Sequence, residues 1–413
     1  MPSSRQGWSQ RGAEEAQGGC SSLARAIEEP PAAAGLRARA GPSSRSHPPP
    51  PPCLPWTEAA PQSRGSAVGE DKQTHPKGQQ SIRCQAMAAQ PVGGQKPFHV
   101  VSPVLESLSL SKAVGTKVFM KLENVQPSGS FKIRGIGHLC QDAAKKGCRH
   151  FVCSSGGNAG LAAAYAAREL GLPITVVVPS SSGPTPVRKL QELGATVEVY
   201  GKVWDDANSR AQELAKTEGW AMVPPFDHPL VWEGHASLVR ELKDSLGAKP
   251  GAIVVAVGGG GLLAGVVAGL QQVGWQDVPI IAAETLGAHS FHEALKAGRL
   301  VTLPDITSVA TCLGAKTVAA RALECAQECR VLSQVVQDAE AVRAVQQFLD
   351  DERVLVEPAC GAPLAVLYSG RLQRLQSEGR LPSPLSSVVL VVCGGSNIHT
   401  AQLRALKSQL GLE

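Results

Sequence analysis

The 413-residue sequence has few aromatic residues and no block rich in lysine or arginine. Aromatic residues make up 4% of the chain, which argues against the rows of stacking side chains that bind single-stranded nucleic acid. The formal net charge of +5 is small for this length. We therefore expect neither nucleic acid nor an acidic membrane surface as a partner. Hydrophobic residues, at 43%, are sufficient for a buried core.

The eleven cysteines lack the spacing of a zinc ribbon. Cys325 and Cys329 lie one helical turn apart, a pattern more typical of packing than of a metal pair. No apolar signal segment precedes the motifs described below, so we expect reduced thiols and a cytoplasmic protein. The uncharged run 251–275 is long enough to span a bilayer, but its strand-like first half and its glycines argue against a membrane helix.

The composition changes sharply near residue 90. Residues 1–86 are rich in proline, serine, arginine and glycine and have no apolar periodicity, so we predict that they form a disordered N-terminal extension. Their acidic residues argue against an organelle transit peptide. Met87 leads into the apolar sequence that starts at Phe98, and we expect the upstream segment to be an alternative or non-native extension.

One lysine lies in a turn of small residues, 128–135, with the sequence Ser-Gly-Ser-Phe-Lys-Ile-Arg-Gly. A helical pattern begins there, so Lys132 is expected near the positive end of a helix. That position and partial burial both disfavour the ammonium form, and a neutral amine can attack an aldehyde to form a Schiff base. Because most lysines after a turn are simply solvated, the assignment depends on two further motifs.

Two glycine-rich loops each join a strand-like run to a helical pattern. The first loop, 154–160, offers hydroxyls and backbone N–H groups to a carboxylate or a phosphate. The second, Gly258–Gly261, has four successive glycines, which would let the backbone curl around a phosphate. It lacks the lysine of a nucleoside-triphosphate loop. Both loops therefore indicate anion sites.

A dinucleotide site is an alternative interpretation of the second loop. Gly259, Gly261 and Ala264 fit the relaxed glycine fingerprint, and Glu284 lies 20 residues further on, where an acid that binds ribose is expected. The chain would then be an NAD-binding oxidoreductase. This interpretation leaves the lysine turn and the first loop without a function.

In combination and in this order, the motifs resemble those of the serine/threonine dehydratase family of fold-type II pyridoxal-phosphate enzymes. The resemblance extends from about Pro97 to the C-terminus. Its carriers are the segments 123–135, 154–160, 224–227, 232–235, 258–261, 356–361 and 392–397. It implies a two-domain α/β fold like that of the tryptophan synthase β subunit, with parallel-rich twisted sheets flanked by helices and the cofactor in the cleft between the domains.

The order of apolar runs agrees with such a fold, because strand-like runs alternate with helical patterns from Phe98 onwards, which indicates βαβ units. Residues 92–125 and 229–413 are expected to form a large cofactor-binding domain. Residues 126–228 would form a small domain that carries Lys132 and the first loop. One helix is expected over 363–378, with Pro363 in its first turn, where proline is tolerated.

The resemblance also implies roles for the motifs. Lys132 would hold pyridoxal phosphate as a Schiff base and then act as the base at Cα, while Phe131 would lie against the ring. Cys393 would face the pyridine nitrogen, and a thiol there makes the ring a weaker electron sink. The cofactor phosphate would lie on the backbone of Gly258, Gly259, Gly260, Gly261 and Leu262.

The substrate carboxylate would lie on the first loop. Asn158 would also reach the ring hydroxyl, and Ser155 is expected to take part in catalysis. The residues of this loop are Ser155, Gly156, Gly157, Asn158 and Ala159. A monovalent cation such as potassium would be bound by oxygens, which suit a hard cation. Its ligands would be Glu284, Ala288, Ser290, Gly258, Leu313 and Ala315. The alternative for Glu284 is an ion pair with a lysine or arginine.

The activity that the resemblance implies is a β-elimination, in which L-serine or L-threonine gives pyruvate or 2-oxobutyrate plus ammonia. Small hydroxy amino acids are therefore the expected substrates, and a homodimer is the expected assembly. Gly156 and Cys312 depart from the residues usual in the family. A pyridoxal-phosphate-binding protein with weak or lost activity thus stays as an alternative, since fold and cofactor do not guarantee turnover.

Overall fold

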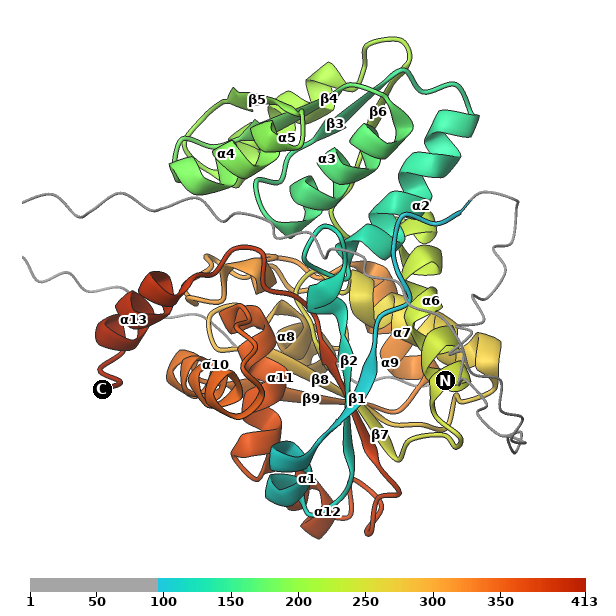
Figure 1. Ribbon diagram of the computed structural model, residues 1–413, viewed down its shortest axis with the longest axis vertical. Coiled ribbons are helices and arrows are strands. Elements are labelled where there is room, and N and C mark those ends of the chain that lie inside the picture. Colours follow the sequence, from blue (N-terminus) through green and yellow to red (C-terminus); the bar gives the residue numbers. More distant parts are fainter. Residues whose placement is uncertain (1–95) are drawn as a thin grey trace, which may run out of the picture. The chain divides into compact units, whose positions relative to one another are not determined.

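The computed structural model describes residues 96–413, and their ten strands form two separate sheets. The predictions for residues 1–86 concern a segment outside these residues. The large sheet has the order β1-β2-β10-β7-β8-β9 (Figure 1). Its strands are β1 (Val104–Ser107), β2 (Val118–Leu122), β7 (Ala252–Ala256), β8 (Ile280–Thr285), β9 (Val331–Val336) and β10 (Val388–Val392). All neighbours in it pair in parallel except β1 and β2, which are antiparallel.

The small sheet consists of four parallel strands in the order β5-β4-β3-β6. Its strands are β3 (His150–Cys153), β4 (Ile174–Val178), β5 (Thr196–Val199) and β6 (Trp220–Met222). The prediction of parallel-rich sheets in an α/β fold is confirmed. The residues of the two sheets agree with the predicted domain division, which itself stays a prediction.

Helices lie on both faces of each sheet (Figure 1). They are α1 (Leu108–Val114), α2 (Lys132–Lys145), α3 (Asn158–Leu170), α4 (Pro184–Glu192), α5 (Trp204–Leu214), α6 (Pro229–Ser245), α7 (Gly261–Val273), α8 (Ser290–Ala297), α9 (Ala320–Glu328), α10 (Asp338–Glu352), α11 (Pro358–Tyr368), α12 (Arg371–Ser377) and α13 (Thr400–Gln409). Short 3-10 helices cover Glu123–Val125 (η1) and Thr311–Leu313 (η2). None of the helices described is long and apolar enough to cross a membrane.

The strand sequences explain this layering. Every residue of β7, β8 and β10 is buried, as expected for parallel strands covered on both faces. In β3, Phe151 and Cys153 pack in the apolar cluster that includes α2 and α3, whereas Val152 packs against α5 on the other face. The side-chain alternation of a single strand thus holds helices on opposite sides of the small sheet.

The predicted helix over 363–378 is wrong in its boundaries. The structure has two helices there, and the first begins at Pro358, so Pro363 lies inside α11 rather than in a first turn. A proline at the first helical position is favourable because its missing N–H would be unpaired in any case. Gly370, with φ +71°, separates the two helices. Sequence periodicity also missed the strands β1, β6 and β9, which are short or only partly buried.

Parallel strands place the predicted motifs at their carboxyl ends. The glycine-rich loops follow β3 and β7, Glu284 lies at the end of β8, and Cys393 follows β10. This is the edge at which open α/β sheets bind ligands.

Helices α2 and α6 cross at two glycines. A Cβ atom on Gly135 would lie 2.4 Å from the Val231 carbonyl oxygen, and one on Gly234 would lie 2.4 Å from the Arg134 carbonyl oxygen. No side chain fits at such distances, so the glycines allow the backbones to approach. The turn that carries Lys132 leads directly into this crossing.

We predict that Gly135→Ala destabilises the protein, although alanine is the better helix former. Overpacking should cost about 1–3 kcal/mol, which outweighs the gain in helix propensity of up to about 1 kcal/mol. Gly247→Ala is the matched control, because a Cβ there meets nothing within 4 Å. Thermal unfolding should show a lower Tm for Gly135→Ala alone. Equal Tm values for both variants would contradict the close crossing.

Candidate active site

The lysine turn is held at its tip by the chain that follows β10. The Phe131 N–H donates to the Cys393 carbonyl oxygen (3.1 Å), and Ser130 pairs with Gly394 in an isolated antiparallel bridge. Gly129 has φ +77°, a conformation that suits glycine, and its carbonyl oxygen accepts from the Gly395 N–H (3.2 Å). Lys132 follows as the first residue of α2.

The amine of Lys132 has an unusual environment for a lysine. Its Nζ donates to the Pro225 carbonyl oxygen at 2.6 Å, and burial lowers its pKa from 10.5 to about 8. The groups that partly oppose this shift are the thiols of Cys312, Cys153 and Cys393, and no carboxylate of the described residues is among them. A substantial fraction of the amine is therefore neutral just above neutral pH, which is the form that attacks an aldehyde.

The tetraglycine loop presents free donors. The N–H groups of Gly259, Gly260, Gly261 and Leu262 donate to no acceptor within residues 96–413. Gly260 has φ +88°, and a Cβ on Gly259 would lie 2.3 Å from the Phe226 ring, so both positions require glycine. The loop ends at the N-terminus of α7, where the helix dipole favours an anion. These donors fit the phosphate of pyridoxal phosphate.

The first loop lies at the N-terminus of α3. Ser155 Oγ accepts from the Gly157 N–H at 3.3 Å, and the N–H groups of Gly156, Asn158 and Ala159 have no acceptor among the described residues. Asn158 begins α3, and its Nδ2 donates to Glu357 Oε2 at 2.9 Å. These free donors suit a carboxylate. Gly156 is not in the left-handed region, and a Cβ there would lie 3.2 Å from Val178 Cγ1.

Cys393 is buried directly after β10. A hydrogen bond with the Cys360 thiol and burial raise the pKa of the Cys393 thiol well above its usual range, so it stays protonated at neutral pH. The Phe131 ring packs against His235, with the ring centroids 5.0 Å apart.

Cys312 links the motifs. Its Sγ lies 3.6 Å from Asn158 Nδ2 of the first loop, and its carbonyl oxygen would be 3.3 Å from a Cβ on Gly258. The Cys312 thiol is also among the groups that partly oppose the lowering of the Lys132 pKa. The structure therefore brings the lysine turn, both glycine-rich loops and Cys393 around one region.

Several residues that line this region were not predicted from the sequence. Glu357 is buried and accepts from both Asn158 and the Asn397 N–H (2.7 Å). Ser396 donates to Asn158 Oδ1, so the side-chain amide is engaged at both ends. Phe226 and Pro225 were noted only as part of a motif. The motif around Glu357 was available in the sequence, but nothing in it shows that the carboxylate turns towards Asn158.

The candidate cation ligands lie in two groups. Glu284 is fully buried and accepts from the Phe291 and His292 N–H groups, both at 2.9 Å, and burial raises its pKa to about 8. Ala288, which follows the next turn, and Ser290, the first residue of α8, are also buried. No lysine or arginine of the described residues pairs with Glu284, so the ion-pair alternative finds no partner.

The other group packs against the tetraglycine loop. A Cβ on Gly258 would lie 3.0 Å from Leu313 Cα, and the Ala315 N–H donates to the Leu313 carbonyl oxygen at 2.8 Å. The Val257 N–H donates to the Ala283 carbonyl oxygen, so both groups lie at the ends of neighbouring strands. No cluster of three His, Cys, Asp or Glu side chains that could hold a metal ion occurs within residues 96–413.

Comparison with known proteins identifies a family. The sequence model described as "Pyridoxal-phosphate dependent enzyme" matches residues 96–394. The human protein named "Serine dehydratase-like" is 70% identical over 317 residues, which cover 77% of this chain and 96% of the human protein. Human "L-serine dehydratase/L-threonine deaminase" is 61% identical over 318 residues, which cover 77% and 97% of the two chains.

A solved structure agrees with the sequence relatives. The fungal L-serine ammonia-lyase from Rhizomucor miehei superposes with a TM-score of 0.72 at 38% identity, covering 76% of this chain and 99% of the fungal chain.

Alkylation should distinguish Cys312 from the other described cysteines. Cys312 is exposed, Cys148 is half-buried, and the remaining described cysteines are buried. Desolvation and the neighbouring Glu357 carboxylate raise the pKa of the Cys312 thiol well above its usual range, so its reaction with iodoacetamide should be slow at pH 7 and faster at each higher pH. We predict that pyridoxal phosphate with substrate protects Cys312 but not Cys148. Equal protection of both thiols, measured by peptide mass spectrometry, would contradict this placement.

Proposed function

Because the chain belongs to the family of pyridoxal-phosphate dependent enzymes, we propose that it catalyses the β-elimination of L-serine and L-threonine, giving pyruvate or 2-oxobutyrate and ammonia. The observation that carries this proposal is the Lys132 amine, which has a pKa of about 8 and no carboxylate partner among the described residues, beside two loops with free N–H donors. The names of relatives that are 61% and 42% identical support the same reaction.

The geometry supports an assignment of residues to the cofactor. The free N–H groups from Gly259 to Leu262 would hold the phosphate, and Lys132 would bond the aldehyde carbon. When bound, pyridoxal phosphate withdraws electrons from the substrate Cα and so weakens its C–H bond. Cys393, as a neutral thiol, would not protonate the ring nitrogen, which favours rapid loss of the β-hydroxyl.

The chain's own groups orient and deprotonate the substrate. The N–H groups of the loop from Ser155 to Ala159 would bind the substrate carboxylate, with Asn158 adjoining them. Lys132 Nζ would take the proton from Cα, since a pKa near 8 suits a base that works close to neutral pH. The Pro225 carbonyl oxygen orients the amine for this transfer. Ser155 supplies the hydroxyl of this loop.

We predict that Lys132→Ala abolishes pyruvate formation from L-serine while the Tm stays close to that of the wild type. Removing the amine eliminates the base and the covalent link to the cofactor but leaves both sheets untouched. A coupled lactate dehydrogenase assay measures the pyruvate. Wild-type turnover by the variant would remove Lys132 from the mechanism. A wild-type protein that binds pyridoxal phosphate but forms no pyruvate would instead favour the alternative of a homologue with lost activity.

We also propose a monovalent cation, such as potassium, at Glu284 and the neighbouring oxygens of Ala288, Ser290, Gly258, Leu313 and Ala315. The support is a fully buried carboxyl group whose partners are two backbone N–H groups and no cationic side chain of the described residues.

Replacing potassium with tetramethylammonium, which is too large for such a site, should lower the Tm of the wild type. A ligand that binds the folded state alone stabilises it in this way. Glu284→Gln should show the same Tm in both salts. An equal Tm of the wild type in both salts would refute the proposed cation site.

A homodimer and a cytoplasmic location complete the proposal. Exposed apolar side chains near the start of the described chain, Val100, Val101, Leu105 and Leu108, support an interface there. All eight described cysteines are free, which suits a reducing compartment.

A further inference from the structure

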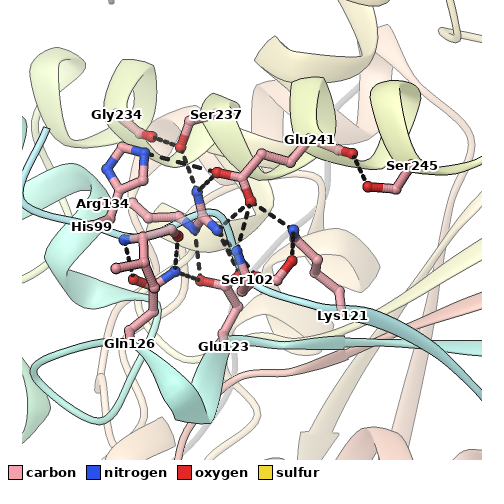
Figure 2. A network of polar contacts seen from close by, with 11 residues as sticks. His99, Ser102, Lys121, Glu123, Gln126, Arg134, Gly234, Ser237, Glu241 and Ser245 are labelled. Atoms are coloured by element: carbon pink, nitrogen blue, oxygen red, sulfur yellow. Dashed lines mark hydrogen bonds and ion pairs between the residues drawn. The ribbon is translucent and has the colours of Figure 1, made fainter. Parts of the chain in front are cut away.

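Four charged side chains from β2, η1, α2 and α6 form a buried cluster (Figure 2). Lys121, Glu123 and Arg134 have no exposed side-chain surface, and the Glu241 side chain is 7% exposed. Two cations face two anions, so the cluster is balanced. His99 lies 3.9 Å from Glu241, and burial lowers its pKa to about 4, so it is neutral at physiological pH.

Arg134 is the centre of this cluster. Its Nε and Nη2 donate to the two oxygens of Glu123 at 2.6 and 2.8 Å. Its Nη1 and Nη2 donate to the two oxygens of Glu241 at 2.6 and 2.7 Å. Ser237 and Ser102 accept the remaining bonds. Two bidentate contacts in one plane need the fork of a guanidinium, which lysine cannot reproduce.

These contacts close the lysine turn at its base. Glu123 precedes the turn and Arg134 lies near its C-terminal end, so their ion pair joins the two ends of the segment that carries Lys132. Glu241 belongs to α6 and also binds Lys121 of β2 at 2.6 Å, which fixes the base of the turn to a helix and to the large sheet. The tip of the turn is fixed separately, by the contacts to residues 393–395.

The energy cost of burying charges indicates that the Arg134 cluster fixes geometry rather than adding stability. Desolvating an ion costs several kcal/mol, and replacing a buried ion pair with apolar residues is often neutral or stabilising. Arg134 is fully buried, touches no loop of the site, and is not among the charges that shift the pKa of Lys132. Its influence on the amine must therefore pass through the backbone of the turn.

We propose that Arg134, clamped by Glu123 and Glu241, is a positioning residue that sets where the Lys132 amine stands relative to the cofactor and the substrate Cα. The proposal rests on the function proposed for Lys132. Because Lys132 is only two residues away along the first turn of α2, a shift of Arg134 would reach the amine through the backbone of that turn.

The first test is Arg134→Lys, which keeps the charge and loses the fork. We expect kcat for L-serine to fall at least tenfold. KM should change less than twofold, since the carboxylate loop belongs to β3 and α3. Arg371→Lys is the matched control, because Arg371 makes a partly buried pair with both oxygens of Glu340 at 2.9 Å in another part of the chain. Phe348→Leu, a change in the core at α10, is a second control. It should lower the Tm and so shows what a general loss of stability does to the kinetics. Both controls should keep kcat within twofold of the wild type.

A second readout does not need turnover. The cofactor-free proteins are mixed with pyridoxal phosphate, reduced with cyanoborohydride at intervals, and the modified Lys132 peptide is quantified. Arg134→Lys should capture the cofactor at least tenfold more slowly than the wild type, whereas the controls should match it. If the wild type makes no pyruvate but Arg134→Lys still captures the cofactor more slowly, the proposed reaction is refuted. The positioning role of Arg134 would then still hold.

If Arg134→Lys does not fold, Glu123→Gln replaces it, because this variant keeps the shape of the partner and opens the same clamp. The same losses in kcat and capture rate are expected. The proposal would be overturned if either variant folds and its kcat and capture rate stay within twofold of the wild type. It would also be overturned if both values fall no further than those of Phe348→Leu at equal Tm.

Discussion

The chemistry proposed for this chain depends on a difference between two desolvated lysines. Lys121 is sealed from solvent and bonded to the Glu241 carboxylate, which partly offsets the fall in pKa that burial causes. Lys132 has a single carbonyl oxygen as its partner, and its pKa falls to about 8. A carboxylate beside Lys132 would hold the ammonium form and prevent attack on an aldehyde. The absence of a counter-charge, rather than burial alone, makes this amine suitable for catalysis.

The fold supplies the other requirements at one edge of its sheets. Parallel strands direct their carboxyl ends to the same side, and the loops there have N–H groups that the helices after them cannot use. These N–H groups would bind anions without a lysine or arginine side chain.

The sequence predicted the parts of the site that depend on local chain chemistry. Four glycines after an apolar strand predict an anion-binding loop, and a lysine in a turn before a helix predicts a reactive amine. Both patterns lie within a few consecutive residues. Glu357 could not be found in this way, because its role depends on Asn158, about 200 positions earlier in the chain. The boundary of α11 was missed for a different reason. The helix is apolar on all sides, so its sequence lacks the periodicity that would have shown where it begins.

The central claim, that the lysine without a carboxylate partner is the one that bonds the cofactor, can be tested by locating that bond. The full chain is saturated with pyridoxal phosphate, reduced with borohydride, digested and analysed by mass spectrometry. The account predicts that the added mass lies on Lys132 and that Lys121 is unmodified. Modification of Lys121, or of any lysine other than Lys132 in stoichiometric amount, would contradict it.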